Sequence, residues 1–528
     1  MWGARTFNFV VGIACRVAHY FAEERPGMTS PVSQPEGFER VPTGVPGFDV
    51  LVHGGFLRGG MYLISGQPGS GKTVFGNQMA FHHVGMGGRA VYVTLLTETH
   101  ARMLAHMSAF SFFRPEPIGD SLYFVSGYQM LQGGALTALL DLLQGVIRDQ
   151  RATLLIIDGL AAVDESVESD ILVKEFLQRL HVYAESHSCT TLLLTHSAPG
   201  TRSRPEFTMV DGLVDMAVRY IGSRTITEVE VSKLRGSKHL RGKHSYEITD
   251  EGIVVHPRTE SVLRGLTATT GQNRKRLAFG IPGLDQMMHG GVLTGSNTVL
   301  YGVPGTGKTM LGLHFLQEGA RNNEPGLYFG FYETAERLIN NAEDLGFDFA
   351  SYARKGDIEI VWQPPLEGNL DYLAEQLLAA VRRRGVKRLF LDGLSGFQEA
   401  GYPERLGRFT VALTNELRSL GVTTVFAVEL LDVFGQALNL PSEGVSSSSE
   451  NIILLRFVEL HSQLYRIVSI VKMRESSYDS SVREFMIDRS GIKVADTFRS
   501  AEAILTGVAS PQGHGQAERD DEYAREHD

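Results

Sequence analysis

Short apolar runs alternate with helical patterns along the first half of the chain. Residues 61–65, 90–96, 153–158 and 190–196 are continuous apolar runs, whereas residues 171–187 repeat their apolar positions every three or four residues. Runs of this length indicate buried strands, and the longer period indicates an amphipathic helix. Strands that alternate with helices predict βαβ units and a mostly parallel sheet.

The second half repeats this order, and both halves end differently from how they begin. Its apolar runs lie at residues 297–302, 326–333, 388–393 and 423–430. Near the end of the first half, residues 227–234 and 244–249 alternate polar and apolar side chains at every second position. That alternation predicts antiparallel strands with one buried face. We therefore predict an α/β fold of two tandem domains, each a mostly parallel twisted sheet flanked by helices, with an antiparallel edge.

The two halves are copies of one unit. TGVPGFDVLVHGG, which begins at Thr43, matches FGIPGLDQMMHGG, which begins at Phe279, and GQPGSGKT from Gly66 matches GVPGTGKT from Gly302 at the same offset. Each copy is long enough for one doubly wound domain. The expected boundaries are an N-terminal extension at 1–35 with an alternative start at Met28, a first domain at 36–257, a polar linker at 258–276, a second domain at 277–507 and a disordered tail at 508–528.

Each copy carries GxxxxGKT between an apolar run and a helical pattern, which is the P-loop signature. Its backbone amides and the helix N-terminus face phosphates, so Lys72 and Lys308 are predicted to contact the β- and γ-phosphates of ATP. Thr73 and Thr309 are predicted ligands of Mg²⁺. A chance Gly-rich turn is the alternative, and two matches in register disfavour it. The predicted ATP-binding residues are Gly66, Gly69, Ser70, Gly71, Lys72, Thr73, Asp158, Gly302, Gly305, Thr306, Gly307, Lys308, Thr309 and Asp392.

Acidic residues end or follow the neighbouring apolar runs. Asp158 and Asp392 stand at the carboxyl ends of expected parallel strands, where the phosphates and the metal lie, so we predict that they complete the Mg²⁺ site. Glu98 and Glu333 follow the strand after each P-loop and are candidates for orienting or deprotonating the attacking water. The alternative is a glutamate that stabilises a helix N-terminus. The predicted catalytic residues are Glu98, Glu333, Lys72 and Lys308.

Composition narrows the class of protein. Hydrophobic residues make up 43% of the 528 residues, as in a globular protein with real cores, and the net charge of −10 disfavours a broad nucleic-acid-binding surface. Two cysteines, Cys15 and Cys189, exclude a disulfide framework and favour the cytoplasm. The apolar stretch near the N-terminus is short and interrupted by Arg16, so we predict no membrane segment.

The chain resembles the KaiC family of tandem RecA-like ATPases from about residue 36 to residue 507. The most specific segments are VSKLRGSKHLRGKHSYEITDEGIVV from Val231, IVKMRESSYDSSVREFMIDRSGI from Ile470 and FRSAEAILTG from Phe498. The resemblance implies a RecA-like fold and a hexamer of two stacked rings with ATP between neighbouring subunits. It also implies a C-terminal tail on which regulatory proteins dock.

The resemblance assigns further residues to the nucleotide of the neighbouring subunit. A Lys-x-Arg pair near the end of each copy is implied to reach the neighbour's γ-phosphate, where a cation stabilises the charge that develops during phosphoryl transfer. An exposed basic strand is the alternative. His239 matches a nucleotide contact of the family, and Tyr478 replaces it in the second copy. The implied trans contacts are Lys233, Arg235, His239, Lys472 and Arg474.

The second domain of the family is an autokinase. Aligning NIILLRFVEL places Ser446 and Ser447, within GVSSSSE, at the phosphorylated positions, although a run of serines is also an ordinary turn. The family usually has two adjacent glutamates after each P-loop strand. Here Thr97 and Tyr332 replace the first of each pair, which leaves the rates of hydrolysis and of the kinase step open.

Three functions remain open at this level. The leading hypothesis is a hexameric ATPase that phosphorylates its own serines and acts in signalling or clock-like regulation. A RecA-like DNA-dependent ATPase would use basic loops, for which Arg202 and Arg204 are the candidates, but the counterpart at residues 432–444 is acidic and apolar. A nucleotide-stabilised scaffold with little turnover is the third hypothesis.

Overall fold

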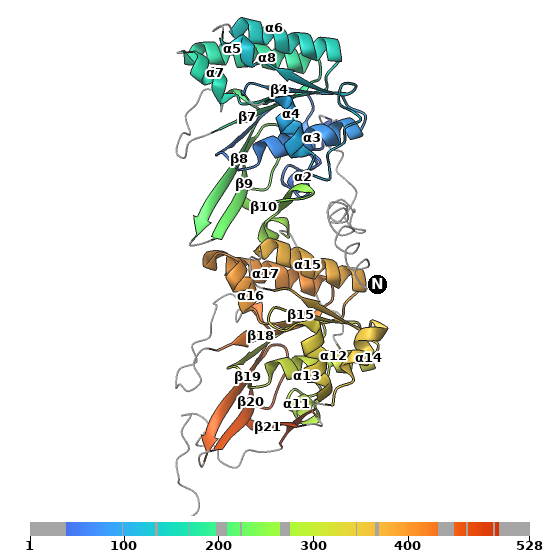
Figure 1. The fold of residues 1–528 in the computed structure, drawn as a ribbon. Helices are drawn as coiled ribbons and strands as arrows, with labels where there is room; N and C mark the ends of the chain where they lie inside the picture. Colours follow the sequence, from blue (N-terminus) through green and yellow to red (C-terminus); the bar gives the residue numbers. More distant parts are fainter. Residues whose placement is uncertain are drawn as a thin grey trace, which may run out of the picture. The chain divides into compact units, whose positions relative to one another are not determined.

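The chain folds into two compact units, and the division between them falls after Val262 (Figure 1). The expected extension, Glu98, Arg202, Arg204, Ser446, Ser447 and the expected tail lie outside the described residues. The computed structural model describes residues 39–97, 99–132, 136–167, 169–196, 208–221, 224–263, 275–344, 346–364, 369–430, 448–460, 463–488 and 491–495.

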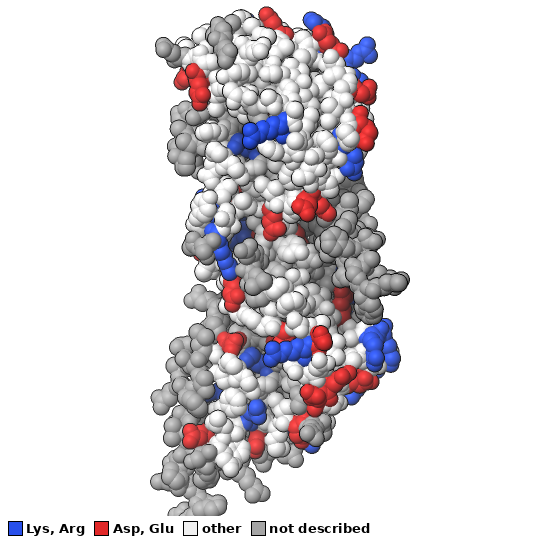
Figure 2. Space-filling view, in the orientation of Figure 1, with Lys and Arg blue, Asp and Glu red and all other residues white. Residues whose placement is uncertain are grey.

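The described surface carries charges of both signs. On the face in Figure 2, Lys and Arg are scattered among Asp, Glu and uncharged residues, and the described part of this face shows no extended basic area. An extended basic area is the usual footprint of a protein that binds a nucleic-acid backbone. Among the helices that the structure describes, none has the length and apolar character needed to cross a membrane.

The first unit is built on a nine-stranded sheet in the order β11-β10-β9-β8-β3-β7-β6-β4-β5. The strands from β8 to β5 in that order are parallel, whereas β9, β10 and β11 are antiparallel. This confirms the mostly parallel sheet with an antiparallel edge. The strands are β3 (Met61–Gly66), β4 (Ala90–Thr94), β5 (Leu122–Ser126), β6 (Leu154–Asp158), β7 (Thr190–Thr195), β8 (Gly212–Ile221), β9 (Arg224–Leu234), β10 (Lys243–Thr249) and β11 (Gly252–His256).

Helices cover both faces of this sheet, which explains why its central strands are apolar throughout. Tyr62 and Ile64 of β3 pack into the core that α3 closes, and Met61 and Leu63 pack into the core beneath α6 and α8. Strands buried on both faces lack polar alternation. The helices are α2 (Phe48–Leu51), α3 (Lys72–Gly85), α4 (His100–Met107), α5 (Tyr128–Gln132), α6 (Leu136–Gln150), α7 (Ala161–Ser166), α8 (Asp170–Ser186) and α10 (Thr259–Val262), and β1 (Arg40–Val41) pairs with β2 (Phe56–Leu57).

The second unit repeats this topology, with the strand order β16-β15-β17-β18-β14-β19-β20-β21-β22. Again β20, β21 and β22 form the antiparallel edge. The strands are β14 (Asn297–Gly302), β15 (Gly326–Gly330), β16 (Ile358–Trp362), β17 (Arg388–Asp392), β18 (Thr423–Glu429), β19 (Asn451–Leu460), β20 (Gln463–Met473), β21 (Arg483–Asp488) and β22 (Gly491–Val494).

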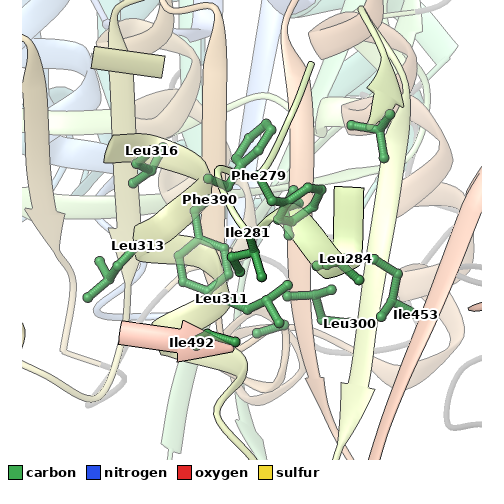
Figure 3. Packing of buried hydrophobic residues seen from close by; sticks show 14 of the residues in the cluster. Phe279, Ile281, Leu284, Leu300, Leu311, Leu313, Leu316, Phe390, Ile453 and Ile492 are labelled. Atoms are coloured by element: carbon green, nitrogen blue, oxygen red, sulfur yellow. The ribbon is translucent and has the colours of Figure 1, made fainter. Parts of the chain in front are cut away.

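One core of the second unit joins its first helices to its last strand. Phe279, Leu284, Leu311, Phe390 and Ile492 are buried and lie close together in Figure 3, although they span most of the unit in sequence. This packing fixes the helix that follows the P-loop against the sheet. The helices are α11 (Pro282–Met287), α12 (Lys308–Arg321), α13 (Ala335–Asp344), α14 (Phe349–Lys355), α15 (Leu370–Arg384), α16 (Ser395–Ala400) and α17 (Pro403–Ser419).

Both ends of the expected linker at residues 258–276 have regular structure. It begins with α10, in which Thr259 and Ser261 are buried. It ends in β12 (Arg276–Leu277), which pairs with β13 (Val292–Leu293). Residues 264–274 lie outside the described residues.

Candidate nucleotide-binding sites

The first P-loop connects the central strand β3 to α3. Gly69 has φ 81° and Gly71 has φ 87°, a left-handed conformation that favours glycine. At Gly66 a Cβ atom would lie 2.4 Å from the carbonyl oxygen of Met216, so the neighbouring strand leaves no room for a side chain. These glycines therefore shape a tight loop whose backbone can approach a ligand.

Lys72 folds back over this loop. Its Nζ donates to the carbonyl oxygens of Gly66 at 2.7 Å and of Gln67 at 3.0 Å. Burial lowers the pKa of Lys72, and the charge of Asp158 opposes that shift. The ammonium group is thus held at the mouth of the loop by neutral carbonyls, which phosphate oxygens would replace as stronger partners.

Asp158 joins two neighbouring elements at the carboxyl end of β6. Its Oδ2 accepts a hydrogen bond from Thr73 Oγ1 at 2.8 Å and another from the Tyr92 hydroxyl at 2.8 Å. The hydroxyl of Ser70 is buried and has no hydrogen-bond partner within the described parts of the chain. The structure thus joins the P-loop threonine to the aspartate at the carboxyl end of β6.

A cavity of about 520 Å³ lies beside the first P-loop, and its volume is within the usual range for a small-molecule site. Lys72, Thr73 and Asp158 form its polar wall, and Glu165 and His196 lie further along it. The candidate base Glu98 lies outside the described residues, so its position relative to this cavity stays a prediction.

The second P-loop reproduces the first. Gly305 and Gly307 have φ values of 77° and 102°, and Lys308 Nζ donates to the carbonyl oxygens of Gly302 at 2.7 Å and Val303 at 3.0 Å. Thr306, the counterpart of Ser70, donates instead to the carbonyl oxygen of Val303 at 2.8 Å. The loop geometry is therefore a property of the repeated motif, whereas the hydrogen bonding of the Ser70 and Thr306 hydroxyls differs between the two loops.

Asp392 repeats the role of Asp158 at the end of β17. Its Oδ2 accepts hydrogen bonds from Thr309 Oγ1 and the Tyr328 hydroxyl, each at 2.9 Å. Burial raises the pKa of Asp392, the two hydroxyl groups lower it, and the nearby charge of Glu333 raises it further. A divalent cation at this carboxylate would relieve that repulsion.

Glu333 lies where the sequence predicts a catalytic carboxylate. It lines a second cavity of about 520 Å³ together with Lys308, Thr309 and Arg466. Its Oε2 accepts a long hydrogen bond of 3.4 Å from Asn341 Nδ2 on α13. The carboxylate thus faces the same space as the P-loop lysine, as activation of a water molecule requires.

Tyr332 occupies the position where the family usually has a second glutamate. Its hydroxyl lies 2.8 Å from Ser395 Oγ and donates to Glu399 Oε1 at 3.4 Å. Burial raises the pKa of Tyr332. A neutral phenol therefore stands beside Glu333, so the second site has one carboxylate at this point.

Two tyrosines of the site escaped the sequence analysis. Tyr92 and Tyr328 each lie in the middle of an apolar run and donate to the strand-end aspartates. Burial and the neighbouring aspartate raise the pKa of both phenols, so both remain hydrogen-bond donors. Their occurrence at matching places of the repeat was the available signal.

The Lys-x-Arg residues lie away from the P-loop of their own domain. Lys233 pairs with Leu213, which pairs with Leu63 near the start of β3, whereas the P-loop follows the end of β3. At ~3.3 Å per strand residue, these positions are about 10 Å apart along the sheet. The register of β14, β19 and β20 gives the same arrangement for the pair in the second domain.

The contacts of Lys233 and Arg235 leave the Arg235 side chain accessible to solvent. Lys233 Nζ and Arg235 Nη2 each donate to the carbonyl oxygen of Thr208 at 3.3 Å, and the Arg235 side chain is 58% exposed. Burial lowers the pKa of His239. In the second domain Lys472 Nζ donates to the Ser449 carbonyl oxygen at 2.8 Å, and the Tyr478 hydroxyl donates to Val471 O at 3.1 Å.

Comparison with known proteins agrees with this geometry. The family model for the KaiC ATPase matches the chain twice, at residues 41–260 and 277–498. Circadian clock oscillator protein KaiC 1 of Synechocystis sp. is 27% identical over 486 residues, which cover 89% of this chain and 92% of that protein. Circadian clock oscillator protein KaiC of Synechococcus elongatus is 28% identical over 494 residues, or 91% of this chain and 94% of that protein. With two P-loop units of matching topology, the chain belongs to the KaiC family of ATPases.

Proposed function

We propose that this protein hydrolyses ATP with Mg²⁺ in both domains of a hexameric double ring and phosphorylates its own serines in the second domain. Its relatives are named circadian clock oscillator proteins, and we propose a clock-like or signalling role with regulatory proteins docking on the C-terminal tail. The observation that carries the proposal is the repeated contact between the P-loop threonine and the strand-end aspartate beside a cavity that the P-loop lysine lines.

The donor set fits magnesium. Mg²⁺ prefers oxygen ligands and is usually bound through one or two protein oxygens together with substrate phosphates. Thr73 with Asp158, and Thr309 with Asp392, present such oxygens within hydrogen-bond distance of each other. When bound, the ion neutralises charge that develops on the phosphates.

Hydrolysis requires a base beside the lysine-bound phosphates. We assign this role to Glu98 and Glu333, of which Glu333 lines the cavity that contains Lys308. The carboxylate takes a proton from water as the water oxygen attacks the γ-phosphorus. The bond from that phosphorus to the bridging oxygen then breaks, and ADP leaves with the electron pair.

The position of the Lys-x-Arg pairs supports action between subunits. Each pair lies level with the start of the strand that leads into its own P-loop, whereas the P-loop follows the end of that strand. Its cations therefore serve a nucleotide that another subunit holds. Such a head-to-tail contact closes into a ring. We therefore assign Lys233, Arg235, Lys472 and Arg474 to the neighbour's phosphates, with His239 as an additional nucleotide contact.

Arg235→Ala together with Arg474→Ala is expected to lower kcat for ATP hydrolysis by about 10- to 100-fold. Removing one charge-stabilising donor costs about 10²–10³ in kcat. We expect a smaller loss here because Lys233 and Lys472 remain. Mixing this variant with Lys72→Ala/Lys308→Ala chains is expected to restore hydrolysis, because each variant supplies what the other lacks. Phosphate release from pre-mixed and separate variants measures the effect. No recovery in mixed rings would contradict action in trans.

Autophosphorylation of Ser446 or Ser447 is expected after incubation with Mg²⁺ and ATP. The Lys472 ammonium group binds the carbonyl of Ser449, so the described end of the serine run lies beside the cation assigned to the neighbour's γ-phosphate. The serine oxygen would attack the γ-phosphorus, give up its proton to a carboxylate and release ADP. Intact-mass and phosphopeptide measurements check this result, with Ser446→Ala/Ser447→Ala as the matched control. An unmodified wild-type spectrum would remove the kinase and leave the ATPase.

A further inference from the structure

One acidic residue anchors the arginine of each Lys-x-Arg pair. Asp211 directly precedes β8, and its carbonyl oxygen accepts a hydrogen bond of 2.8 Å from the backbone nitrogen of Arg235. Glu450 directly precedes β19 and accepts the same bond from Arg474 at 3.0 Å. The sequence analysis singled out neither acid, although both occupy the same place in the repeat.

The side chains of these acids reach the strand that leads into the P-loop. Asp211 Oδ2 accepts from the backbone nitrogen of Met61, the first residue of β3, at 3.0 Å. Glu450 Oε2 accepts from the backbone nitrogen of Asn297, the first residue of β14, at 2.8 Å. Each acid thus links the strand that holds the chain's own nucleotide loop to the arginine assigned to the neighbour's nucleotide.

A cation from the preceding long helix completes each cluster, and here the two domains differ. In the first domain His181 Nε2 of α8 lies 3.0 Å from Asp211 Oδ2. In the second domain Arg418 of α17 forms an ion pair and hydrogen bond with Glu450. Arginine stays charged at all physiological pH values, whereas histidine changes its charge there.

We propose that Asp211 and Glu450 are positioning residues for Arg235 and Arg474, and that His181 makes this positioning pH-responsive in the first domain alone. The proposal rests on the trans role of Arg235 given above. His181 lies on α8, far from either P-loop in sequence, and thereby contributes to the control of hydrolysis.

The direction of the pH effect follows from the charges of His181, Asp211 and Arg235. Asp211 Oδ1 lies 3.8 Å from Arg235 Nη1. While His181 is protonated, the carboxylate divides its attraction between two cations, and the cluster of His181, Asp211 and Arg235 has a net charge of +1. Loss of the proton leaves Arg235 and Lys233, whose charge also interacts with that of Asp211, as the cations beside this carboxylate. The carboxylate then retains Arg235 more strongly on its own subunit. A lower pH therefore releases Arg235 towards the neighbour's phosphates.

The surroundings of His181 raise its pKa above the ordinary value for histidine. The hydrogen bond from His181 to Asp211 raises the pKa of His181, burial opposes it, the charges of Asp211 and Glu185 raise it and that of Arg235 lowers it. Strand β7, which also packs on α8, carries only Thr and Leu residues. On α6 the charged residues Asp141, Arg148 and Asp149 are exposed. The raised pKa means that the transition lies above the ordinary value of ~6.5.

The test measures kcat of the first site against pH in full-length Lys308→Ala chains, in which the second site is silenced. We expect kcat to fall severalfold as the pH rises through the His181 transition. His181→Arg, which copies the cation of the second domain, is expected to hold the high value at every pH. His181→Gln is expected to hold the low value, and KM for ATP is expected to stay unchanged in both variants.

Two comparisons separate failure of this inference from failure of the proposed function. If Arg235→Ala has no effect on kcat in the same background, the trans role fails. If Arg235→Ala lowers kcat but His181→Arg and His181→Gln retain the wild-type pH profile, the positioning inference is overturned. As a reciprocal check, Arg418→His in Lys72→Ala chains is expected to give the second site a pH dependence that it otherwise lacks, and its absence would also count against the inference.

Discussion

Chains with both Lys72→Ala and Lys308→Ala are expected to bind no ATP that calorimetry can detect in the presence of Mg²⁺. Each ammonium group is held at the loop mouth by two carbonyl oxygens, ready to exchange them for phosphate oxygens. Charge-assisted hydrogen bonds to phosphate are roughly twice as strong as neutral ones. Truncation leaves the partly buried phosphates without their main counter-charge, so hydrolysis is expected to fall to background as well.

The single variants give this experiment its internal control. Lys72→Ala alone and Lys308→Ala alone are each expected to halve the stoichiometry of nucleotide uptake, because the two loops lie in separate units. Lys174→Ala removes a lysine from the exposed face of α8 and is expected to leave uptake unchanged. Undiminished uptake by the double variant would refute the assignment of both P-loops.

Chains with Glu98→Gln and Glu333→Gln are expected to hydrolyse ATP about 10²–10⁴-fold more slowly while still binding it, because an amide cannot accept the proton of the attacking water. Glu333 shares a cavity with Lys308, and its charge raises the pKa of Asp392, so it lies close to the proposed Mg²⁺ site. Phosphate release measures the rate, and calorimetry confirms that the nucleotide is retained.

Glu336→Gln is the matched control for this experiment. Glu336 is an exposed acid in the first turn of α13, three residues after Glu333, and its loss is expected to change the rate little. Equal trace rates in the wild type and the Glu98→Gln/Glu333→Gln variant would instead favour the nucleotide-stabilised scaffold. The two single variants show how the rate divides between the two domains.

Replacement of the usual first glutamate has a structural consequence in the second site. Tyr332 turns its hydroxyl to Ser395 and Glu399 instead of presenting a second carboxylate beside Glu333. Repulsion between adjacent carboxylates raises the pKa of one of them. A phenol at position 332 removes that repulsion from the second site.

The sequence by itself determined the features that are local or repeated. Apolar runs without alternation predicted strands buried on both faces, and β3 and β14 have that burial because helices cover both sides. The glycine pattern predicted the loops, since Gly71 and Gly307 need left-handed backbone angles that other residues rarely adopt. A short motif encodes such angles completely, so no distant contact was needed to find the P-loops.

Only the tertiary structure decided which distant residues meet. Asp158 bonds Thr73 and Tyr92 because β6 and β4 are neighbours and end at one edge of the sheet. The strand pairing also places each Lys-x-Arg pair near the start of the strand that leads into the P-loop, at the opposite end from the P-loop itself. It brings His181 to Asp211 as well. The hydrophobic pattern specifies that a strand is buried but not which strands flank it, because any apolar neighbour satisfies the same burial.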